Sequence, residues 1–316
     1  MSYDPFIQPK DHEAAVQAIV DAHQSTLALS AIPQALSQSN HETAVYRAAR
    51  QACLYMGFID ADAACAASAW QKQTERTGRF DAHHWPTEPL DFGIQALPRA
   101  KSFPACPQQL GLYAVLPDAA WVARMARAGV PTLQLRFKSD DPAAIQREVQ
   151  AAVQAVEGTD ALLFINDHWQ SAIAAGAYGV HLGQEDMDTA DLDAIRQAGL
   201  RLGLSTHGYA EMCLADKHAP SYIAMGAVFP TTLKRMTTAA QGTGRLHAYA
   251  QLLREYPLVA IGGIDMARLA EVMASGVGSV AVVRALLEAN DPEAEARRLR
   301  DAIHKLDHPM RDKSTL

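Results

Sequence analysis

Residues 133–138, LQLRFK, bring together side chains that could bind an anion. If the segment is a strand, Gln134, Arg136 and Lys138 share one face, because side chains alternate with a period of two. An amide and two cations would be costly as ordinary core, since an unpaired buried charge loses its hydration. We therefore interpret this face as the wall of an open pocket, where arginine donates two hydrogen bonds and lysine supplies a point charge. A solvated face on an exposed edge strand is the alternative.

Two acidic residues follow the next two predicted strands. Asn166 and Asp167 come at the end of strand 161–166, and Asp186 comes just after strand 179–183. Mg²⁺ prefers one or two carboxylates together with phosphate oxygens and water. Two carboxylates from neighbouring loops, close to two cationic side chains, therefore suit a magnesium diphosphate. Either aspartate could instead cap a helix, and Asp186 in particular precedes a predicted helical segment.

Two later segments could contact a phosphate group. The loop after strand 222–228 is long and polar, and it contains Thr231, Thr232 and Lys234. Such a loop can close on a substrate phosphate, although it could also be a plain surface connection. Strand 258–263 ends in a Gly-Gly pair whose backbone N–H groups can approach an anion.

Eight short β-rich segments alternate with amphipathic helical segments from about residue 110 onward. The predicted strands are 110–116, 132–137, 161–166, 179–183, 201–206, 222–228, 258–263 and 279–284. Eight strand–helix units predict an α/β fold, the (β/α)8 TIM barrel. An open doubly wound sheet is the structural alternative. It would need a glycine-rich phosphate loop after an early strand, and the sequence has none there. In a barrel the C-terminal ends of all strands meet at one face, and here those ends are the polar ones.

The first hundred residues have a different pattern. Helical periodicity covers 11–29, 41–58 and 61–78, without a convincing strand, and a Pro-rich stretch without periodicity follows at 83–108. We therefore expect a small α-helical extension with a Pro-rich linker in residues 1–100 and a TIM-barrel domain in residues 101–316. The sequence does not reveal what the extension does.

Composition narrows the class of protein. The chain has 316 residues, of which 49% are hydrophobic and 20% charged, as in ordinary globular proteins. A net charge of -7 argues against nucleic acid or an anionic membrane as a partner. The four cysteines, which have neither disulfide-framework nor zinc spacing, are Cys53, Cys65, Cys106 and Cys213. Because there is no signal peptide and no long apolar run, we expect a cytoplasmic protein, and the sequence leaves a homo-oligomer open.

Seven motifs resemble those of the thiamine phosphate synthase family and occur in its order and approximate spacing. They are LQLRFK, FINDHW, GVHLGQED, LGLSTH, VFPTTLK, VAIGGI and GVGSVAVV, spread over roughly residues 110–290. The resemblance implies a transferase that joins 4-amino-5-hydroxymethyl-2-methylpyrimidine diphosphate to a thiazole phosphate, plain or carboxylated. The products would be thiamine phosphate and pyrophosphate, formed by a dissociative mechanism.

The resemblance also implies roles for individual residues. The pyrimidine diphosphate would contact Gln134, Arg136, Lys138, Asn166, Ser205 and Lys234. Mg²⁺ would bind Asp167 and Asp186. The thiazole phosphate would contact Thr231, Thr232, Gly263, Val283 and Arg284. Arg136, Lys138 and Lys234 would be the catalytic residues, because they stabilise charge on the departing diphosphate.

Two positions depart from the family pattern. The family usually has Thr-x-Thr-Lys in the loop where this chain has Leu233 before Lys234, and it usually has serine where this chain has Arg284. Both changes fall on the thiazole phosphate side. A thiazole tautomerase-like enzyme is one alternative, although tautomerases need no diphosphate clamp. A non-catalytic protein that binds thiazole phosphate or thiamine phosphate is the other.

Overall fold

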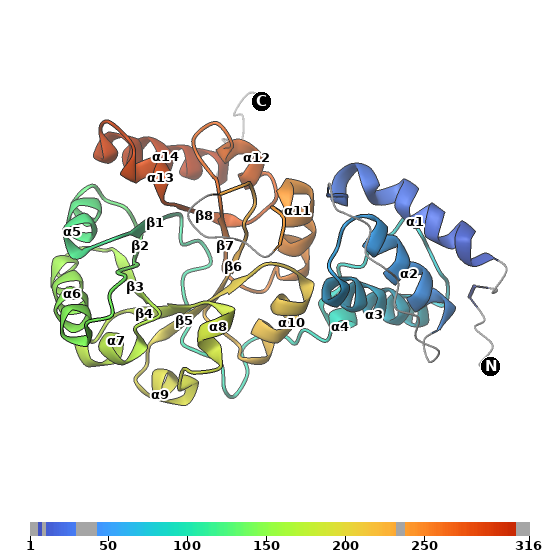
Figure 1. Ribbon diagram of the computed structural model, residues 1–316, viewed down its shortest axis with the longest axis horizontal. Helices are drawn as coiled ribbons and strands as arrows, with labels where there is room; N and C mark the ends of the chain where they lie inside the picture. The colour runs from blue at the N-terminus through green and yellow to red at the C-terminus, as the bar shows by residue number, and fades with distance from the viewer. Residues whose placement is uncertain (1–5, 8–10, 30–42, 232–237, 308–316) are drawn as a thin grey trace, which may run out of the picture.

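Eight parallel strands form a closed barrel in the computed structural model, which describes residues 6–7, 11–29, 43–231 and 238–307 (Figure 1). Each strand pairs with the next along the chain, and β8 pairs with β1. The strands are β1 (Leu112–Leu116), β2 (Thr132–Leu135), β3 (Leu162–Asn166), β4 (Gly179–Leu182), β5 (Arg201–Thr206), β6 (Tyr222–Met225), β7 (Leu258–Ile261) and β8 (Gly278–Val282). The predicted (β/α)8 barrel is therefore confirmed.

Helices follow every strand and surround the barrel. They are α5 (Ala119–Arg127), α6 (Pro142–Ala155), α7 (Trp169–Ala175), α8 (Gln184–Met187), α9 (Leu192–Gln197), α10 (Tyr209–Lys217), α11 (Gly242–Leu252), α12 (Leu269–Met273), α13 (Arg284–Leu287) and α14 (Pro292–Asp307). Aspartate side chains cap three of them: Asp118 caps α5, Asp141 caps α6 and Asp191 caps α9. Each accepts a hydrogen bond from a free backbone N–H in the first turn, which explains where these helices begin.

Aromatic rings fill the interior of the barrel below its C-terminal face. The ring centroids of Phe164 and Tyr222 lie 5.0 Å apart, and those of Tyr113 and Phe164 lie 6.0 Å apart. Glycines on the neighbouring strands make room for these rings. A methyl carbon at Gly203 would lie 2.1 Å from Cζ of Tyr222, and one at Gly179 would lie 2.5 Å from Cε1 of Phe164. The interior is thus packed protein rather than a pore.

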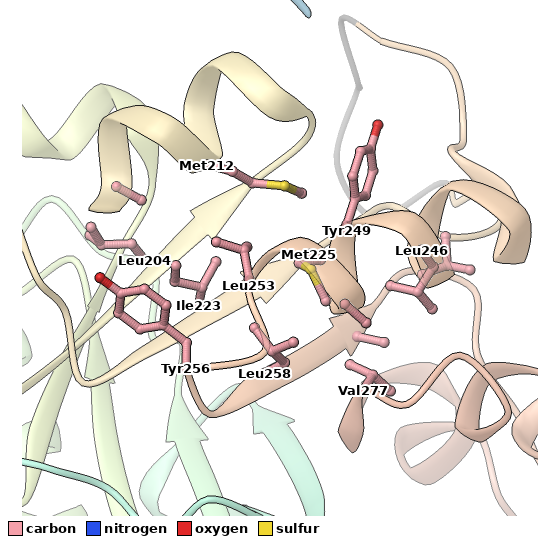
Figure 2. Close-up of a cluster of buried hydrophobic side chains, with 14 of the residues drawn as sticks. Leu204, Met212, Ile223, Met225, Leu246, Tyr249, Leu253, Tyr256, Leu258 and Val277 are labelled. Atoms are coloured by element: carbon pink, nitrogen blue, oxygen red, sulfur yellow. The ribbon is translucent and has the colours of Figure 1, made fainter. Parts of the chain in front are cut away.

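The larger core lies between the outer face of the barrel and the helices. Figure 2 shows the part of this core where β5, β6 and β7 meet α10 and α11. Leu204, Ile223 and Leu258 of the strands are buried in the same cluster as Met212 and Leu246 of the helices. The outward side chains of the strands are apolar for this reason, with the exception of Thr206. Near the C-terminal face, the polar inward side chains come from β2 to β5: Gln134, Asn166, His181 and Ser205.

Four helices precede the barrel and lie beside α10 and α11 (Figure 1). They are α1 (His12–Leu27), α2 (Ala44–Tyr55), α3 (Asp60–Thr77) and α4 (Pro89–Phe92). The Asp62 side chain of α3 accepts a hydrogen bond from the backbone N–H of Ala210 at 2.9 Å, so the extension caps a barrel helix. The helical extension is confirmed, and its Pro-rich linker contains one short helix. None of the described helices is both long and apolar enough to span a membrane.

The end of β2 differs from the prediction. The sequence predicts a strand over 132–137, whereas β2 ends at Leu135. The backbone N–H of Arg136 still donates to the carbonyl of Leu116 at 2.8 Å, so the chain follows β1 for one more residue. Phe137 and Lys138 lie beyond the sheet, where the paired edge of β1 has ended.

We expect Gly203→Ala to destabilise the barrel by about 1–3 kcal/mol, because the methyl group would collide with the Tyr222 ring. Urea denaturation measures this loss. The same substitution in a Tyr222→Leu background, which lacks the outer ring atoms, should cost less. An equal cost in both backgrounds would contradict the steric explanation.

Candidate functional site

A cavity of about 640 Å³ opens at the C-terminal face of the barrel. Every predicted site residue that the structure describes lines it: Gln134, Arg136, Lys138, Asn166, Asp167, Asp186, Ser205, Thr231, Gly263, Val283 and Arg284. Predictions for Thr232 and Lys234 fall outside the described residues. The barrel topology explains this convergence, because parallel strands deliver their C-terminal ends to one face.

Hydrogen bonds join the polar residues on the floor of the cavity. The Nε2 amide of Gln134, which is 5% exposed, donates to Oδ1 of Asn166 at 2.7 Å. The Tyr113 hydroxyl donates to Oε1 of Gln134 at 3.0 Å, and its oxygen lies 2.7 Å from the hydroxyl oxygen of Tyr222. Because the only hydroxyl hydrogen of Tyr113 is already used, Tyr222 is the donor in that second bond. The buried Gln134 of β2 is therefore satisfied by side chains from its two neighbouring strands, β1 and β3.

His181 continues this chain of hydrogen bonds. Its Nδ1 lies 2.6 Å from the hydroxyl oxygen of Tyr222, and its Nε2 lies 2.8 Å from Oγ of Ser205. Since Tyr222 donates its hydrogen elsewhere, Nδ1 of His181 carries the proton and Nε2 accepts from Ser205. Burial lowers the pKa of His181 from 6.5 to about 4, which keeps the imidazole neutral at pH 7. The sequence prediction missed His181, although it occupies an inward position of the strand in the motif GVHLG.

Two carboxylates and one ammonium group meet at the rim. Nζ of Lys138 lies 2.7 Å from Oδ2 of Asp167, and Asp186 accepts a hydrogen bond from the backbone N–H of Gly183 at 3.0 Å. Burial raises the pKa of Asp186, and the neighbouring carboxylate of Asp167 raises it further. Asp167 has a φ of 63°, a left-handed conformation that aspartate tolerates better than most residues.

The donor set at this rim fits Mg²⁺. Asp167 and Asp186 line the same cavity, and the negative charge of Asp167 raises the pKa of Asp186, as a neighbouring like charge does. A divalent cation relieves such repulsion, and magnesium completes its shell with phosphate oxygens and water. Among the described residues, no group of three or more His, Cys, Asp or Glu side chains forms a metal site. The pair therefore suits a cation shared with a ligand rather than a site enclosed by protein. The alternative role predicted for Asp186, an N-cap that precedes a helix, is not what the structure shows. Asp186 is the third residue of α8, and its side chain reaches back to the backbone N–H of Gly183, the residue before the helix.

Two arginines in the cavity are free to bind an anion. Within the described part of the chain, the guanidinium groups of Arg136 and Arg284 form no ion pair. Arg136 follows β2 and Arg284 follows β8, and β1 is the only strand between them. Each can present two parallel N–H donors to a phosphate group.

The wall after β7 requires glycine. Gly262 has a φ of 109° and Gly263 a φ of 65°, and a methyl carbon at Gly262 would lie 2.6 Å from Cα of Ala227. Backbone from β6 and β7 thus approaches closely at this point. The guanidinium of Arg268 donates to the carbonyl of Gly263 and stacks 4.6 Å from the centroid of Phe229, which fixes the turn.

These features define a (β/α)8-barrel protein with a polar, anion-accepting cavity at its C-terminal face. Residues 112–286 match the family model described as thiamine monophosphate synthase, and the chain belongs to that family. It is 55% identical over 193 residues to the thiamine-phosphate synthase of Neisseria meningitidis serogroup B, covering 61% of this chain and 94% of that protein. It is 51% identical over 189 residues to the thiamine-phosphate synthase of Yersinia pseudotuberculosis serotype O:1b, covering 60% of this chain and 88% of that protein.

A solved structure agrees with the assignment. The thiamine phosphate pyrophosphorylase from Pyrococcus furiosus aligns with a TM-score of 0.56 and 27% sequence identity, covering 62% of this chain and 96% of that structure. The family match begins at residue 112, so it leaves out the N-terminal helices.

The lowered pKa of His181 predicts a pH dependence of stability. The folded group has a pKa of about 4 and its ordinary value is 6.5, so the unfolded state binds a proton at higher pH than the folded state. The free energy of unfolding should therefore fall as the pH drops from 6.5 to 4, by about 3 kcal/mol from this group. Urea denaturation of wild type and His181→Gln at several pH values isolates the contribution. Parallel curves over this interval would contradict it.

Proposed function

We propose that the chain is a thiamine phosphate synthase, a transferase that joins 4-amino-5-hydroxymethyl-2-methylpyrimidine diphosphate to thiazole phosphate or its carboxylated form. Thiamine phosphate and pyrophosphate are the products. The observation that carries this proposal is the meeting of Arg136 and Arg284 with the Asp167–Asp186 pair in one cavity of the family barrel. Such a cavity suits two phosphorylated substrates, one of which brings a metal ion.

The pyrimidine substrate is assigned to the side of the cavity formed by β2 to β5. The hydrogen-bond chain leaves the Nδ2 amide of Asn166 as a donor and the lone pairs of Ser205 Oγ as acceptors. An aminopyrimidine offers the complementary groups, a ring nitrogen that accepts and an amino group that donates. Gln134 makes one protein bond at each end of its amide, which orients Asn166, and its second Nε2 hydrogen is assigned to the predicted substrate contact.

The diphosphate is assigned to the rim above β2 and β3. Arg136 supplies a bidentate donor, and Lys138 supplies a positive charge held by Asp167. Lys234 is assigned to the same group from its sequence motif, outside the described residues. Asp167 and Asp186 would hold Mg²⁺, which when bound neutralises negative charge on the diphosphate.

The proposed reaction needs no protein nucleophile. The bond between the pyrimidine methylene carbon and the diphosphate oxygen breaks, and its electron pair leaves with pyrophosphate. The aminopyrimidine ring delocalises the resulting positive charge, and the lone pair of the thiazole nitrogen then forms the new carbon–nitrogen bond. Arg136 and Lys138 contribute by stabilising charge that grows on the leaving group, and the cavity walls hold the two substrates in contact.

The thiazole phosphate is assigned to the side formed by β6, β7 and β8. Thr231, Gly263, Val283 and Arg284 line this wall, and Thr232 is assigned with them from its motif, outside the described residues. Arg284 stands where the family usually has serine. Its guanidinium supplies charge and two donors where the family uses hydroxyl groups.

Two other functions fit the fold less well. A thiazole tautomerase-like enzyme would not need a cationic clamp beside a pair of carboxylates, and both are present. A non-catalytic binding protein for thiazole phosphate or thiamine phosphate would bind ligand without releasing pyrophosphate.

The proposal also assigns the synthase activity to a TIM-barrel domain of residues 101–316. It places the protein in the cytoplasm, and the four free cysteines support that location.

Purified protein, supplied with both substrates and Mg²⁺, should release pyrophosphate and form thiamine phosphate. Arg136→Ala should lower kcat by about 100-fold to 1000-fold, because it removes a donor to charge that develops as the bond breaks. Pyrophosphate release at saturating substrate measures this. Arg147→Ala, an exposed arginine on α6, is the control and should match wild type. A loss of less than about threefold in Arg136→Ala would remove this residue from the reaction.

Arg284→Ser should raise the KM for thiazole phosphate by about tenfold, because a charged donor is lost from the wall. The KM for the pyrimidine diphosphate should stay nearly constant. Initial-rate measurements with one substrate varied at a time give both values. An unchanged KM for thiazole phosphate would refute the assignment.

Asp186→Asn should raise the Mg²⁺ concentration needed for half-maximal rate by about tenfold, equivalent to about 1.4 kcal/mol of binding energy. The amide keeps a side-chain oxygen that can accept from Gly183, so the start of α8 should persist. A magnesium titration of the rate measures the shift. Coincident titration curves for variant and wild type would exclude Asp186 from the metal site.

A further inference from the structure

The N-terminal helices make close contact with α11 of the barrel. A methyl carbon at Gly244 would lie 1.9 Å from the carbonyl oxygen of Thr26, so the backbone at the end of α1 rests directly on α11. Only glycine permits this approach. The extension is therefore fitted to the barrel rather than merely tethered to it.

Arg245, the next residue of α11, is 2% exposed and is held by the extension. Its Nε donates to the carbonyl of Leu27 at 2.9 Å, and its Nη2 donates to the carbonyl of Met56 at 2.9 Å. The guanidinium carbon lies 3.5 Å from the ring centroid of Phe58, a cation–π contact. No ion pair of Arg245 occurs in the described ranges. Acceptors from the extension thus compensate most of the lost hydration of this buried charge.

The remaining amino group of Arg245 reaches Gln241, just before α11. Its Nη1 donates to Oε1 of Gln241 at 3.1 Å, and the Tyr249 hydroxyl donates to the same oxygen at 3.0 Å. The backbone N–H of Gln241 donates to the carbonyl of Ala227 at 2.9 Å, and that of Gly242 donates to the carbonyl of Val228 at 2.9 Å. Gln241 therefore connects the buried arginine to the segment that follows β6.

That segment is part of the cavity wall. Ala227 lines the cavity and packs against Gly262, where an added methyl carbon would lie 2.6 Å from Cα of Ala227. The backbone N–H of Phe229 donates to the carbonyl of Gly262 at 2.9 Å. A shift of Gln241 would thus be transmitted to both backbone segments on the side assigned to thiazole phosphate.

We propose that Arg245 is a positioning residue for the synthase reaction, through which the N-terminal helices hold Gln241 and, with it, the wall of the thiazole phosphate site. The proposal rests on the proposed function and gives the extension a task. It predicts that weakening this connection changes the affinity for thiazole phosphate more than the affinity for the pyrimidine substrate. A purely structural role would lower stability and leave both KM values of the folded protein unchanged.

The test uses the full-length protein with Arg245→Lys and Tyr249→Phe. Lysine keeps the charge but cannot reach three acceptors in a planar fork, and phenylalanine removes only the second donor to Gln241. We expect the KM for thiazole phosphate to rise by about tenfold in Arg245→Lys, with less than a twofold change for the pyrimidine diphosphate. Tyr249→Phe should shift the same KM in the same direction by a smaller factor.

Hydrogen exchange of the backbone amides of Gln241 and Gly242 provides a readout that does not depend on activity. Exchange should be faster in both variants, because these amides lose support for their bonds to the carbonyls after β6. Arg254→Met is the matched control, since Arg254 also contacts the extension, at the carbonyl of Thr87 and the carboxylate of Glu88, but does not touch Gln241. It should leave KM and exchange at wild-type values.

Unchanged exchange in folded Arg245→Lys and Tyr249→Phe, or unchanged KM for thiazole phosphate, would overturn the proposal. An equal effect of Arg254→Met would also overturn it, because any contact with the extension would then suffice. A wild-type protein that exchanges normally but never releases pyrophosphate would refute the proposed function instead. The exchange data would still decide whether Arg245 holds Gln241.

Discussion

A directional chain of hydrogen bonds inside the barrel governs the rest of the site. It runs from the hydroxyl of Ser205 through His181, Tyr222 and Tyr113 to the amide of Gln134, and each group donates to the next. Because every donor has one acceptor, the tautomer of the imidazole and the orientation of the amide are both fixed. The chain thereby joins six polar side chains, all buried except the half-buried Ser205, and leaves no charge on the floor of the cavity.

This neutral floor explains why the charges of the site lie at the rim. Lys138 is more than half exposed, and Asp167 and Asp186 follow the strands rather than lie within them. At the rim these groups keep part of their hydration until a ligand arrives, so their desolvation accompanies binding instead of folding. A ligand can thus have an uncharged ring deep in the barrel and its phosphate groups near the surface.

The sequence alone was sufficient to predict the barrel and to predict that the residues of the motifs meet at one cavity. Period-two alternation placed Gln134 and Arg136 at one cavity, and the ends of the parallel strands did the same for Asp167 and Arg284. The sequence was not sufficient to predict the hydrogen bonds among His181, Tyr113 and Tyr222. Their positions in the strands are those of ordinary core residues, and nothing in their spacing shows that their polar atoms meet. The end of β2 was placed two residues too late because alternation continues past Leu135 while strand pairing does not.

The contact between Arg245 and the carbonyl of Leu27 joins positions 218 residues apart. At a synthesis rate of about 5–20 residues per second, the carbonyl leaves the ribosome roughly 10–40 seconds before its partner. During that interval the first helices can pack on one another but not on the barrel, so the faces that contact α10 and α11 are open to chaperones or to other nascent chains. The N-terminal part of this protein therefore completes its folding late in translation, after most of the barrel has emerged.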